Sequence, residues 1–378
     1  MGEAIILVPG LFGFAKIGDI EYFSAARGLL IRATGIQDVT PLATPPTGPL
    51  WRRVDALHRA VLDKRAHGAT RVHLVGHSTG GVDVRLLTNS KYVWPGGPTG
   101  ADRTSFFDSI GAVVPISAPQ KGTPIARRLR GTLESFIPTF FLVSFLAKYE
   151  SGEAGRAEAV EERLELILRA LARSLALRSG DLTSIDPLGG LPEGTAAALG
   201  AFLQEIVEDH PLIHELTPFA MNALNEKIAP ESGARALDLA PFVTVAPPPA
   251  VHLSDVRFHG GLSPVQRLFY AASYEETRLR PLEFGPLPEG PWIGKPSDDV
   301  LQSATTAQDG VVPAASQTMD GRAEGLVYGD HLDVVGHYPG AELGGATVFD
   351  SGADFDDARM TQLWNAVANV IRRGLGAP

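Results

Sequence analysis

The sequence contains no cysteine, little charge and no run of basic residues. Without cysteine it can form no disulfide, no thiol nucleophile and no cysteine-ligated metal site. Charged residues make up 20% of the 378 residues and hydrophobic residues 44%, so the chain is too apolar to be disordered and can bury a sizeable core. The net charge of −10 at pH 7 argues against nucleic-acid partners.

The N-terminus also lacks the features of a secretion signal. Glu3 stands where a signal peptide has its basic residues, and the apolar run 4–8 is short and ends at Pro9. The apolar run 136–149 has 14 residues, which are too few to span a bilayer. We therefore expect a cytoplasmic protein without a transmembrane segment, although a trimmed form of a secreted protein would show the same N-terminus.

What the chain does have is an alternation of strand-like and helical patterns. The apolar runs 4–8, 71–75 and 110–116 are rich in β-branched residues, which is typical of strands buried on both faces of a parallel sheet. Helical patterns at 51–66 and 82–88 lie between these runs. The alternation predicts an α/β fold with a mostly parallel central sheet flanked by helices.

The pattern changes after Gly122, where helical segments replace strands. Apolar residues recur at helical spacing over 157–178 and 195–208, and Thr217 followed by Pro218 is a typical helix start. Strand-like segments are predicted again at 242–245, 251–258 and 269–274, before a closing helix at 356–373. The predicted division is a core of residues 1–121 and 231–378 and a helical cap, or lid, of residues 122–230.

One motif points to a nucleophilic serine. Gly76-His77-Ser78-Thr79-Gly80 fits the pattern G-x-S-x-G between a strand-like run and a helical one. In such a nucleophile elbow a strand turns sharply into a helix, and glycine flanks the turn because larger side chains would clash there. A glycine-rich chain also matches the bare pattern by chance, but the strand and helix around it favour Ser78 as a nucleophile over a structural turn.

A serine nucleophile needs a base that takes its proton and an acid that orients the base. In folds with this elbow the chain order is serine, acid, histidine. His331 follows the short apolar segment 325–328, and Asp309 lies at a turn 22 residues before it. Taken alone, Asp309 could merely cap the turn and His331 could be a hydrogen-bonded loop histidine. Their order after the elbow favours Asp309 as acid and His331 as base.

Acyl transfer at a serine also needs backbone N–H donors for the oxyanion. One donor is the residue after the nucleophile, here Thr79, and the other belongs to a loop after an early strand. Residues 9–13 form such a loop, in which Leu11 is the first choice of donor and Phe12 the second, since Pro9 has no N–H. A plain strand-ending turn is the alternative.

In these motifs the sequence resembles the α/β-hydrolase lipases, in particular the bacterial true lipases of the Pseudomonas and Burkholderia type. The matching segments are Val8–Gly13, Gly76–Gly81 with Arg85, Ile116–Gly122, Leu216–Pro218 with Asn225, 308–312 and 331–333. Each segment is short, and their shared order along most of the chain makes the resemblance specific. It implies Ser78, Asp309 and His331 as the catalytic triad and Leu11 and Thr79 as the oxyanion donors.

The chain departs from this family at several positions. Pro9 replaces the family's usual histidine, and the disulfide of some of these lipases cannot form here. The family's structural calcium uses an aspartate two residues after the base, which matches Asp333. The next ligand position holds His337, a poor ligand because Ca²⁺ prefers oxygen. We therefore expect no metal and no cofactor.

The predicted cap carries a concentrated apolar surface over 136–146. Phe136, Phe140 and Phe141, together with Phe12 of the oxyanion loop, are candidates for binding an apolar acyl chain. Either this surface is simply the core of the cap, or the cap is mobile and makes transient contact with a lipid interface.

The sequence thus favours a serine carboxylic-ester hydrolase, a lipase or esterase acting on apolar acyl esters. Intracellular polyester depolymerisation or acyl transfer to another alcohol would use the same triad. A lipid-binding protein without catalytic activity on the same fold is the third possibility.

Overall fold

The computed structural model describes residues 2–17, 20–127, 205–206, 209–229, 238–250, 263–278, 285–296, 298, 300, 305–339, 341 and 349–375. Residues 128–204 lie outside this part of the chain. The predicted helix 157–178, most of the predicted helix 195–208 and the predicted strand 251–258 therefore lie outside the described residues, and the division into core and cap stays a prediction.

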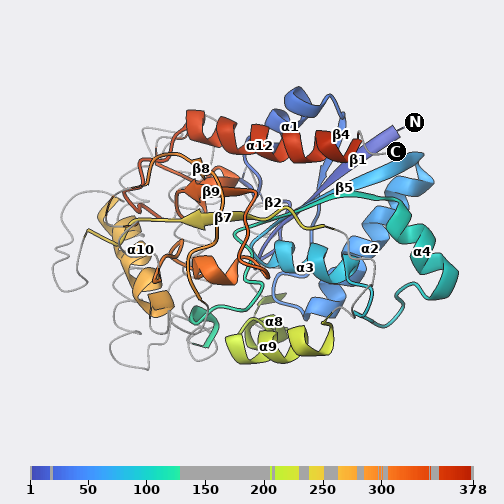
Figure 1. Ribbon diagram of the computed structural model, residues 1–378, viewed down its shortest axis with the longest axis horizontal. Helices are drawn as coiled ribbons and strands as arrows, with labels where there is room; N and C mark the ends of the chain where they lie inside the picture. Colours follow the sequence, from blue (N-terminus) through green and yellow to red (C-terminus); the bar gives the residue numbers. More distant parts are fainter. Residues whose placement is uncertain are drawn as a thin grey trace, which may run out of the picture.

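A parallel sheet of seven strands forms the centre of the molecule (Figure 1). Its order is β4-β1-β5-β6-β7-β9-β8, and all neighbouring strands are parallel. The strands are β1 (Gly2–Val8), β4 (Asp38–Pro41), β5 (Ala69–His77), β6 (Ile110–Ile116), β7 (Phe242–Val245), β8 (Trp292–Ile293) and β9 (Gly325–Tyr328). The three strand-like runs of the first third of the chain and the run at 242–245 all form strands, which confirms the α/β class.

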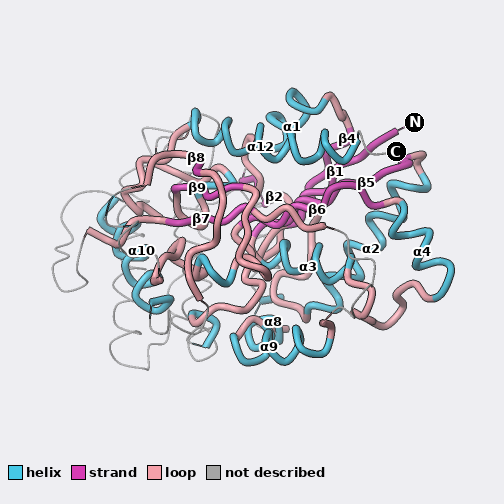
Figure 2. The backbone as a smooth tube through the Cα atoms, in the orientation of Figure 1, coloured by secondary structure: helices cyan, strands magenta, loops and turns pink. Residues whose placement is uncertain are grey.

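Helices cover both faces of this sheet (Figures 1 and 2). Ile5 and Leu7 of β1 point to one face and pack in a core with α1 (Ala26–Thr34) and α12 (Asp357–Leu375). Ile6 and Val8 point to the other face and pack with α2 (Leu50–Ala66), α3 (Thr79–Thr88) and α4 (Gly100–Asp108). Because side chains alternate along a strand, a continuous apolar run supplies both cores.

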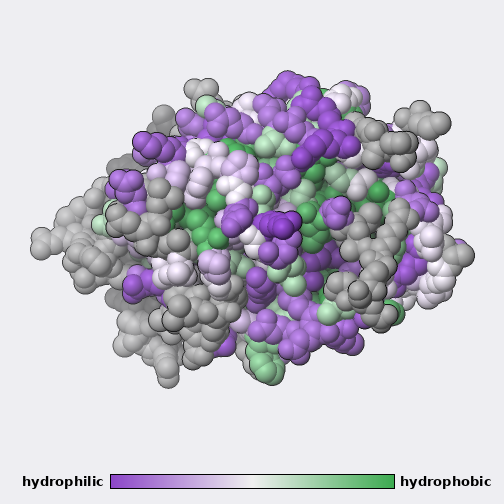
Figure 3. Space-filling view, viewed as in Figure 1, coloured by the Kyte–Doolittle hydropathy of each residue, from purple (hydrophilic) through white to green (hydrophobic). Residues whose placement is uncertain are grey.

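The remaining described elements do not belong to this seven-stranded sheet. They are α8 (Pro211–Glu215), α9 (Pro218–Lys227), α10 (Ser263–Arg278), the short hairpin of β2 (Lys16–Ile17) and β3 (Ile20–Glu21), and the 3₁₀ turns η3 (Ala314–Ser316) and η4 (Asp333–Val335). The Thr217 hydroxyl caps α9 by accepting a hydrogen bond from the Ala220 N–H at 3.4 Å, as predicted. Most of the coloured face in Figure 3 is polar, with apolar patches on both sides of its centre and a paler one at the lower edge, where α9 lies.

The strand predicted at 269–274 is wrong, since these residues lie inside the helix α10. Its buried residues Tyr270, Ala271, Tyr274 and Thr277 recur at helical spacing. The aromatic residues favour a strand by propensity, but packing of one helical face against the chain decides the structure.

Glycine lets α3 approach the sheet more closely than any other residue would. A Cβ on Gly80 would lie 2.1 Å from the Val8 carbonyl oxygen, and a Cβ on Gly76 would lie 2.1 Å from the Gly80 carbonyl oxygen. Both contacts involve backbone atoms, which cannot rotate away. The first turn of α3 is therefore held directly against the carboxyl ends of β1 and β5.

We predict that Gly80→Ala destabilises the protein by at least ~1–3 kcal/mol, because the added methyl group overpacks a backbone contact. The matched control is Gly28→Ala in α1, where the new Cβ would meet only the end of the Arg32 side chain at 3.3 Å. That change should stabilise the helix by about 0.5–1 kcal/mol. Thermal unfolding of both variants measures the effect, and an unchanged melting temperature for Gly80→Ala would contradict the close packing.

Candidate active site

Ser78 stands at a strained turn between β5 and α3. Its backbone has φ 54° and ψ −126°, a conformation that non-glycine residues rarely adopt. The Ser78 N–H donates to the Ile116 carbonyl at 2.8 Å, and the Ser78 carbonyl accepts from the Gly81 N–H at 2.9 Å. These two bonds hold the turn, and they place the side chain at the carboxyl end of the sheet with 7% of its surface exposed.

The structure brings the three predicted triad residues together. The Ser78 Oγ lies 2.9 Å from His331 Nε2, and His331 Nδ1 lies 2.8 Å from Asp309 Oδ2. His331 is 5% exposed and Asp309 is completely buried. Ser78 follows β5, and His331 follows β9, so parallel strands deliver both groups to the same edge of the sheet.

Asp309 is held by donors on both carboxylate oxygens. Oδ1 accepts from the N–H groups of Val311 and Val312 at 2.9 and 2.7 Å. Oδ2 accepts from the Thr244 hydroxyl at 2.7 Å and from the Gln317 amide at 3.2 Å, in addition to His331. A buried carboxylate with this many donors is satisfied as an anion, and it fixes the orientation of the base.

This arrangement also fixes the protons on His331. An ionised Asp309 can only accept hydrogen bonds, so His331 Nδ1 carries the proton that it donates to Asp309. The Nε2 lone pair then faces the Ser78 hydroxyl. The His331 backbone N–H donates to the Asp309 carbonyl oxygen at 3.0 Å, which joins the acid and base loops a second time.

The oxyanion loop passes directly beside the nucleophile. A Cβ on Gly10 would lie 2.6 Å from Ser78 Cβ, so only glycine fits there. Thr79 is the first residue of α3, where a backbone N–H has no acceptor within the helix. The Gly10 N–H donates to the Tyr22 hydroxyl at 2.9 Å and the Phe12 N–H to the Pro46 carbonyl oxygen at 2.8 Å, whereas the Leu11 N–H makes no hydrogen bond to a described residue.

Two buried side chains that the sequence analysis did not single out support this loop. Arg53 donates to the Pro9 carbonyl oxygen at 2.7 Å and forms a fully buried ion pair with Asp83, whose Oδ2 lies 2.8 Å away. Burial raises the pKa of Asp83 to about 6, and the Arg53 charge opposes that rise. Arg53 lies on α2 and Asp83 on α3, and no local pattern around either residue indicates that it belongs to the site.

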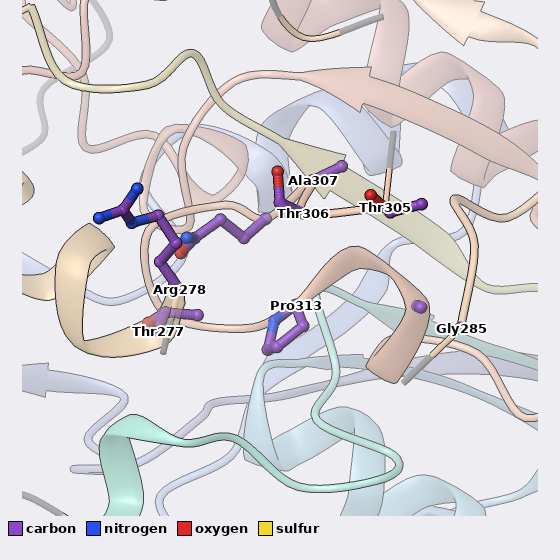
Figure 4. Close-up of a pocket in the computed structure, with 9 residues that line it drawn as sticks. Thr277, Arg278, Gly285, Thr305, Thr306, Ala307 and Pro313 are labelled. Carbon is purple, nitrogen blue, oxygen red and sulfur yellow. The ribbon is translucent and has the colours of Figure 1, made fainter. Parts of the chain in front are cut away.

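Of the residues predicted to bind an acyl chain, the structure describes only Phe12. Phe136, Phe140 and Phe141 lie outside the described residues, and Phe12 is buried with φ 66°. One cavity of about 10 Å³ is lined by residues that include Arg278, Gly285 and Pro313 (Figure 4), and its size suits a single water molecule. An open hollow of about 570 Å³ lies near Ala69, at the opposite end of β5 from Ser78. Neither space is an acyl-chain pocket next to the nucleophile.

Asp333, the residue that the resemblance links to calcium, pairs with a second carboxyl group. The Asp330 N–H donates to Asp333 Oδ2 at 2.7 Å, and both side chains are buried. The His337 ring donates to the Tyr22 carbonyl at 3.0 Å. No group of three or more histidine, aspartate or glutamate residues in the described part of the chain could hold a metal ion.

Burial changes the acidity of this carboxyl pair. It raises the pKa of Asp330 to about 6, and it raises the pKa of Asp333 well above its usual range, with the Asp330 charge adding to the effect. Each group therefore holds its proton more tightly in the folded state than in the unfolded state. Its stabilising contribution is complete below about pH 4 and is lost as the pH rises through the folded pKa.

We predict that Asp330→Asn stabilises the protein more at pH 8 than at pH 4.5, because asparagine removes a buried charge that forms only at the higher pH. The difference should be on the order of 1–2 kcal/mol. The asparagine Oδ1 can still accept hydrogen bonds from the N–H groups of Leu332 and Asp333, which lie 2.9 and 3.1 Å from Oδ1 of Asp330. Chemical denaturation at the two pH values measures the change in the free energy of unfolding. A larger stabilisation at pH 4.5 than at pH 8 would contradict the prediction.

None of the helices in the described ranges is both long and apolar enough to cross a membrane.

The chain has relatives among curated bacterial lipases. No protein-family model matches it. It is 32% identical over 126 residues to the triacylglycerol lipase of Pseudomonas fragi, a match that covers 33% of this chain and 38% of that lipase. It is 32% identical over 132 residues to the triacylglycerol lipase of Vibrio cholerae, covering 35% of this chain and 37% of the relative. The matches thus span little more than a third of the relatives' own length.

Solved structures that resemble the chain include other lipases and esterases. The lipase of Staphylococcus hyicus has a TM-score of 0.47 at 15% identity, covering 99% of this chain and 96% of its own. A metagenomic carboxyl esterase has a TM-score of 0.46 at 17% identity, covering 98% of this chain and 76% of its own.

The fold is assigned from the chain's own sheet topology and from the order of its site residues. Its parallel sheet places the strained serine turn directly after a central strand, and the order along the chain is serine, aspartate, histidine. This protein therefore has the α/β-hydrolase fold and is related in sequence, over about a third of its length, to bacterial triacylglycerol lipases.

Proposed function

We propose that this protein is a serine carboxylic-ester hydrolase that cleaves esters of apolar acyl groups through an acyl-enzyme intermediate. The observation that carries the proposal is the continuous hydrogen-bonded series from Ser78 through His331 to Asp309, at a serine whose backbone is held in a strained turn. Strain of this kind persists where the surrounding structure holds it, and it clusters at functional sites.

The proposed first half-reaction begins at the serine hydroxyl. His331 Nε2 accepts the proton as Ser78 Oγ attacks the ester carbonyl carbon. The electron pair of the carbonyl double bond moves to its oxygen, which the N–H groups of Leu11 and Thr79 stabilise. The tetrahedral intermediate then collapses, the His331 imidazolium returns the proton to the departing alcohol, and the acyl group stays on Ser78.

Water completes the cycle in the second half-reaction. His331 takes a proton from the water as its oxygen attacks the acyl carbonyl, and the same two N–H groups stabilise the second oxyanion. The bond to Ser78 Oγ breaks, and His331 returns the proton to the serine. Throughout, the Asp309 carboxylate keeps His331 in one tautomer and stabilises its positive charge without itself taking the proton.

The substrate class rests on the relatives and on the composition of the cap segment. The two curated relatives are triacylglycerol lipases, so the proposed substrates are esters with apolar acyl chains. The segment 122–230, which the proposal treats as a cap, carries the apolar run 136–146. In this proposal Phe136, Phe140 and Phe141 of that run bind the acyl chain, and the cap makes transient contact with a lipid interface.

The proposal predicts that Ser78→Ala lowers kcat for p-nitrophenyl butyrate by roughly 10⁴- to 10⁶-fold, because no other group can form the acyl-enzyme. The p-nitrophenolate that each turnover releases measures kcat. Circular dichroism and the melting temperature serve as the control, since the methyl side chain of alanine should leave the fold intact. Near-normal turnover in a folded Ser78→Ala variant would exclude Ser78 as the nucleophile.

A further inference from the structure

His77, the residue before the nucleophile, lies between two loops that are far apart in sequence. Its Nδ1 lies 2.7 Å from the Tyr22 hydroxyl, and its Nε2 lies 2.8 Å from the His331 carbonyl oxygen. The Tyr22 hydroxyl in turn accepts from the Gly10 N–H at 2.9 Å. One series of buried hydrogen bonds therefore runs from the oxyanion loop through the nucleophile elbow to the base loop.

The chemistry of the end groups fixes every proton in this series. The His331 carbonyl can only accept, so His77 Nε2 carries a proton and donates it. His77 Nδ1 is then an acceptor if the ring is neutral, and the Tyr22 hydroxyl donates to it. The hydroxyl oxygen still has a lone pair for the Gly10 N–H. Each group thus makes the contact that its donors and acceptors allow.

Burial keeps both side chains uncharged. It lowers the pKa of His77 well below its usual range, and the neighbouring His331 lowers it further. It also raises the pKa of Tyr22, against the influence of the Gly10 hydrogen bond and the Arg53 charge. A neutral His77 adds no charge beside His331, whose ring centroid lies 4.8 Å away.

The Tyr22 bond fixes one half of a peptide unit whose other half is held by Arg53. Arg53 donates to the Pro9 carbonyl, and Tyr22 accepts from the Gly10 N–H, so the plane of the Pro9–Gly10 peptide cannot turn freely. The next N–H along the chain belongs to Leu11, and the one after it, on Phe12, donates to Pro46. The Leu11 N–H therefore lies between two fixed peptides.

We infer that Tyr22 and His77 are positioning residues that hold the oxyanion loop and the base in register with Ser78. Their hydrogen bonds reach Gly10 and the His331 backbone and not the side chains of the triad, so they act through those two backbone groups. The inference rests on the proposed function, since it assigns the role within the same ester-hydrolase site. It explains why a polar ring is found at His77, which is completely buried at the carboxyl end of the inner strand β5.

The test is a kinetic comparison of variants of the full chain with p-nitrophenyl butyrate. Tyr22→Phe removes only the hydroxyl and should lower kcat by about 10- to 100-fold, with KM changed less than about twofold, because positioning acts on the transition state. His77→Leu should cause a similar loss. His77→Gln should keep kcat within about fivefold of the wild type, since its amide can accept from Tyr22 and donate to the His331 carbonyl.

Two further variants separate positioning from general stability. Tyr338→Phe removes another buried tyrosine hydroxyl, one that donates to Asp357 at the start of α12, and should leave kcat unchanged. The double variant Tyr22→Phe/His77→Leu should lose no more than the more impaired single variant, because both changes break one series. If His77→Leu does not fold, Tyr22→Phe and His77→Gln still decide the question.

A kcat for Tyr22→Phe within twofold of the wild type would overturn the inference, and so would an equal loss in Tyr338→Phe. Either result would leave the proposed function intact, because Ser78→Ala tests that separately. Activity retained in Ser78→Ala would instead refute the proposed function and the positioning role together.

Discussion

The tight turn at Ser78 is the constraint on which the rest of the site depends. A serine with φ 54° can be held only if the chain before and after it is fixed, and Gly76 and Gly80 allow this by direct contact between backbone atoms. The turn lies at the carboxyl end of β5, in the middle of a parallel sheet. The other strands of this parallel sheet end along the same carboxyl edge, so the loops that follow them can supply groups to the site. The parallel topology brings together an acid, a base and an oxyanion loop that are up to 320 residues apart in sequence.

Buried polar groups then hold those loops at fixed positions. Both carboxylate oxygens of Asp309 accept hydrogen bonds from protein donors. The buried ion pair of Arg53 and Asp83 anchors the oxyanion loop. Neutral His77 connects that loop to the base. Such groups cost free energy if any partner is missing, so each is sensitive to small displacements. This cost favours a single geometry of the site, and catalysis by positioned N–H donors requires a single geometry.

The local signals in the sequence were enough to predict the elbow, the central strands and the meeting of Ser78, Asp309 and His331. Periodicity failed at 269–274, where aromatic residues suggested a strand but one buried helical face decided the outcome. The helix α1 and the strand β4 were not predicted, because each is short, at nine and four residues, and β4 leads into the proline-rich segment 41–50. Tyr22 carried no signal at all, since its role depends on Gly10 and His77, which only the fold brings to it.

The central claim is that Ser78 is an activated nucleophile, and covalent labelling tests it most directly. A fluorophosphonate probe reacts with a serine only when a base activates its hydroxyl and an oxyanion hole accepts the phosphonyl oxygen. We predict one probe molecule per folded chain, attached at Ser78 when the labelled peptide is mapped by mass spectrometry, and no labelling after heat denaturation. A folded protein that is not labelled, or that is labelled at another serine, would contradict the account.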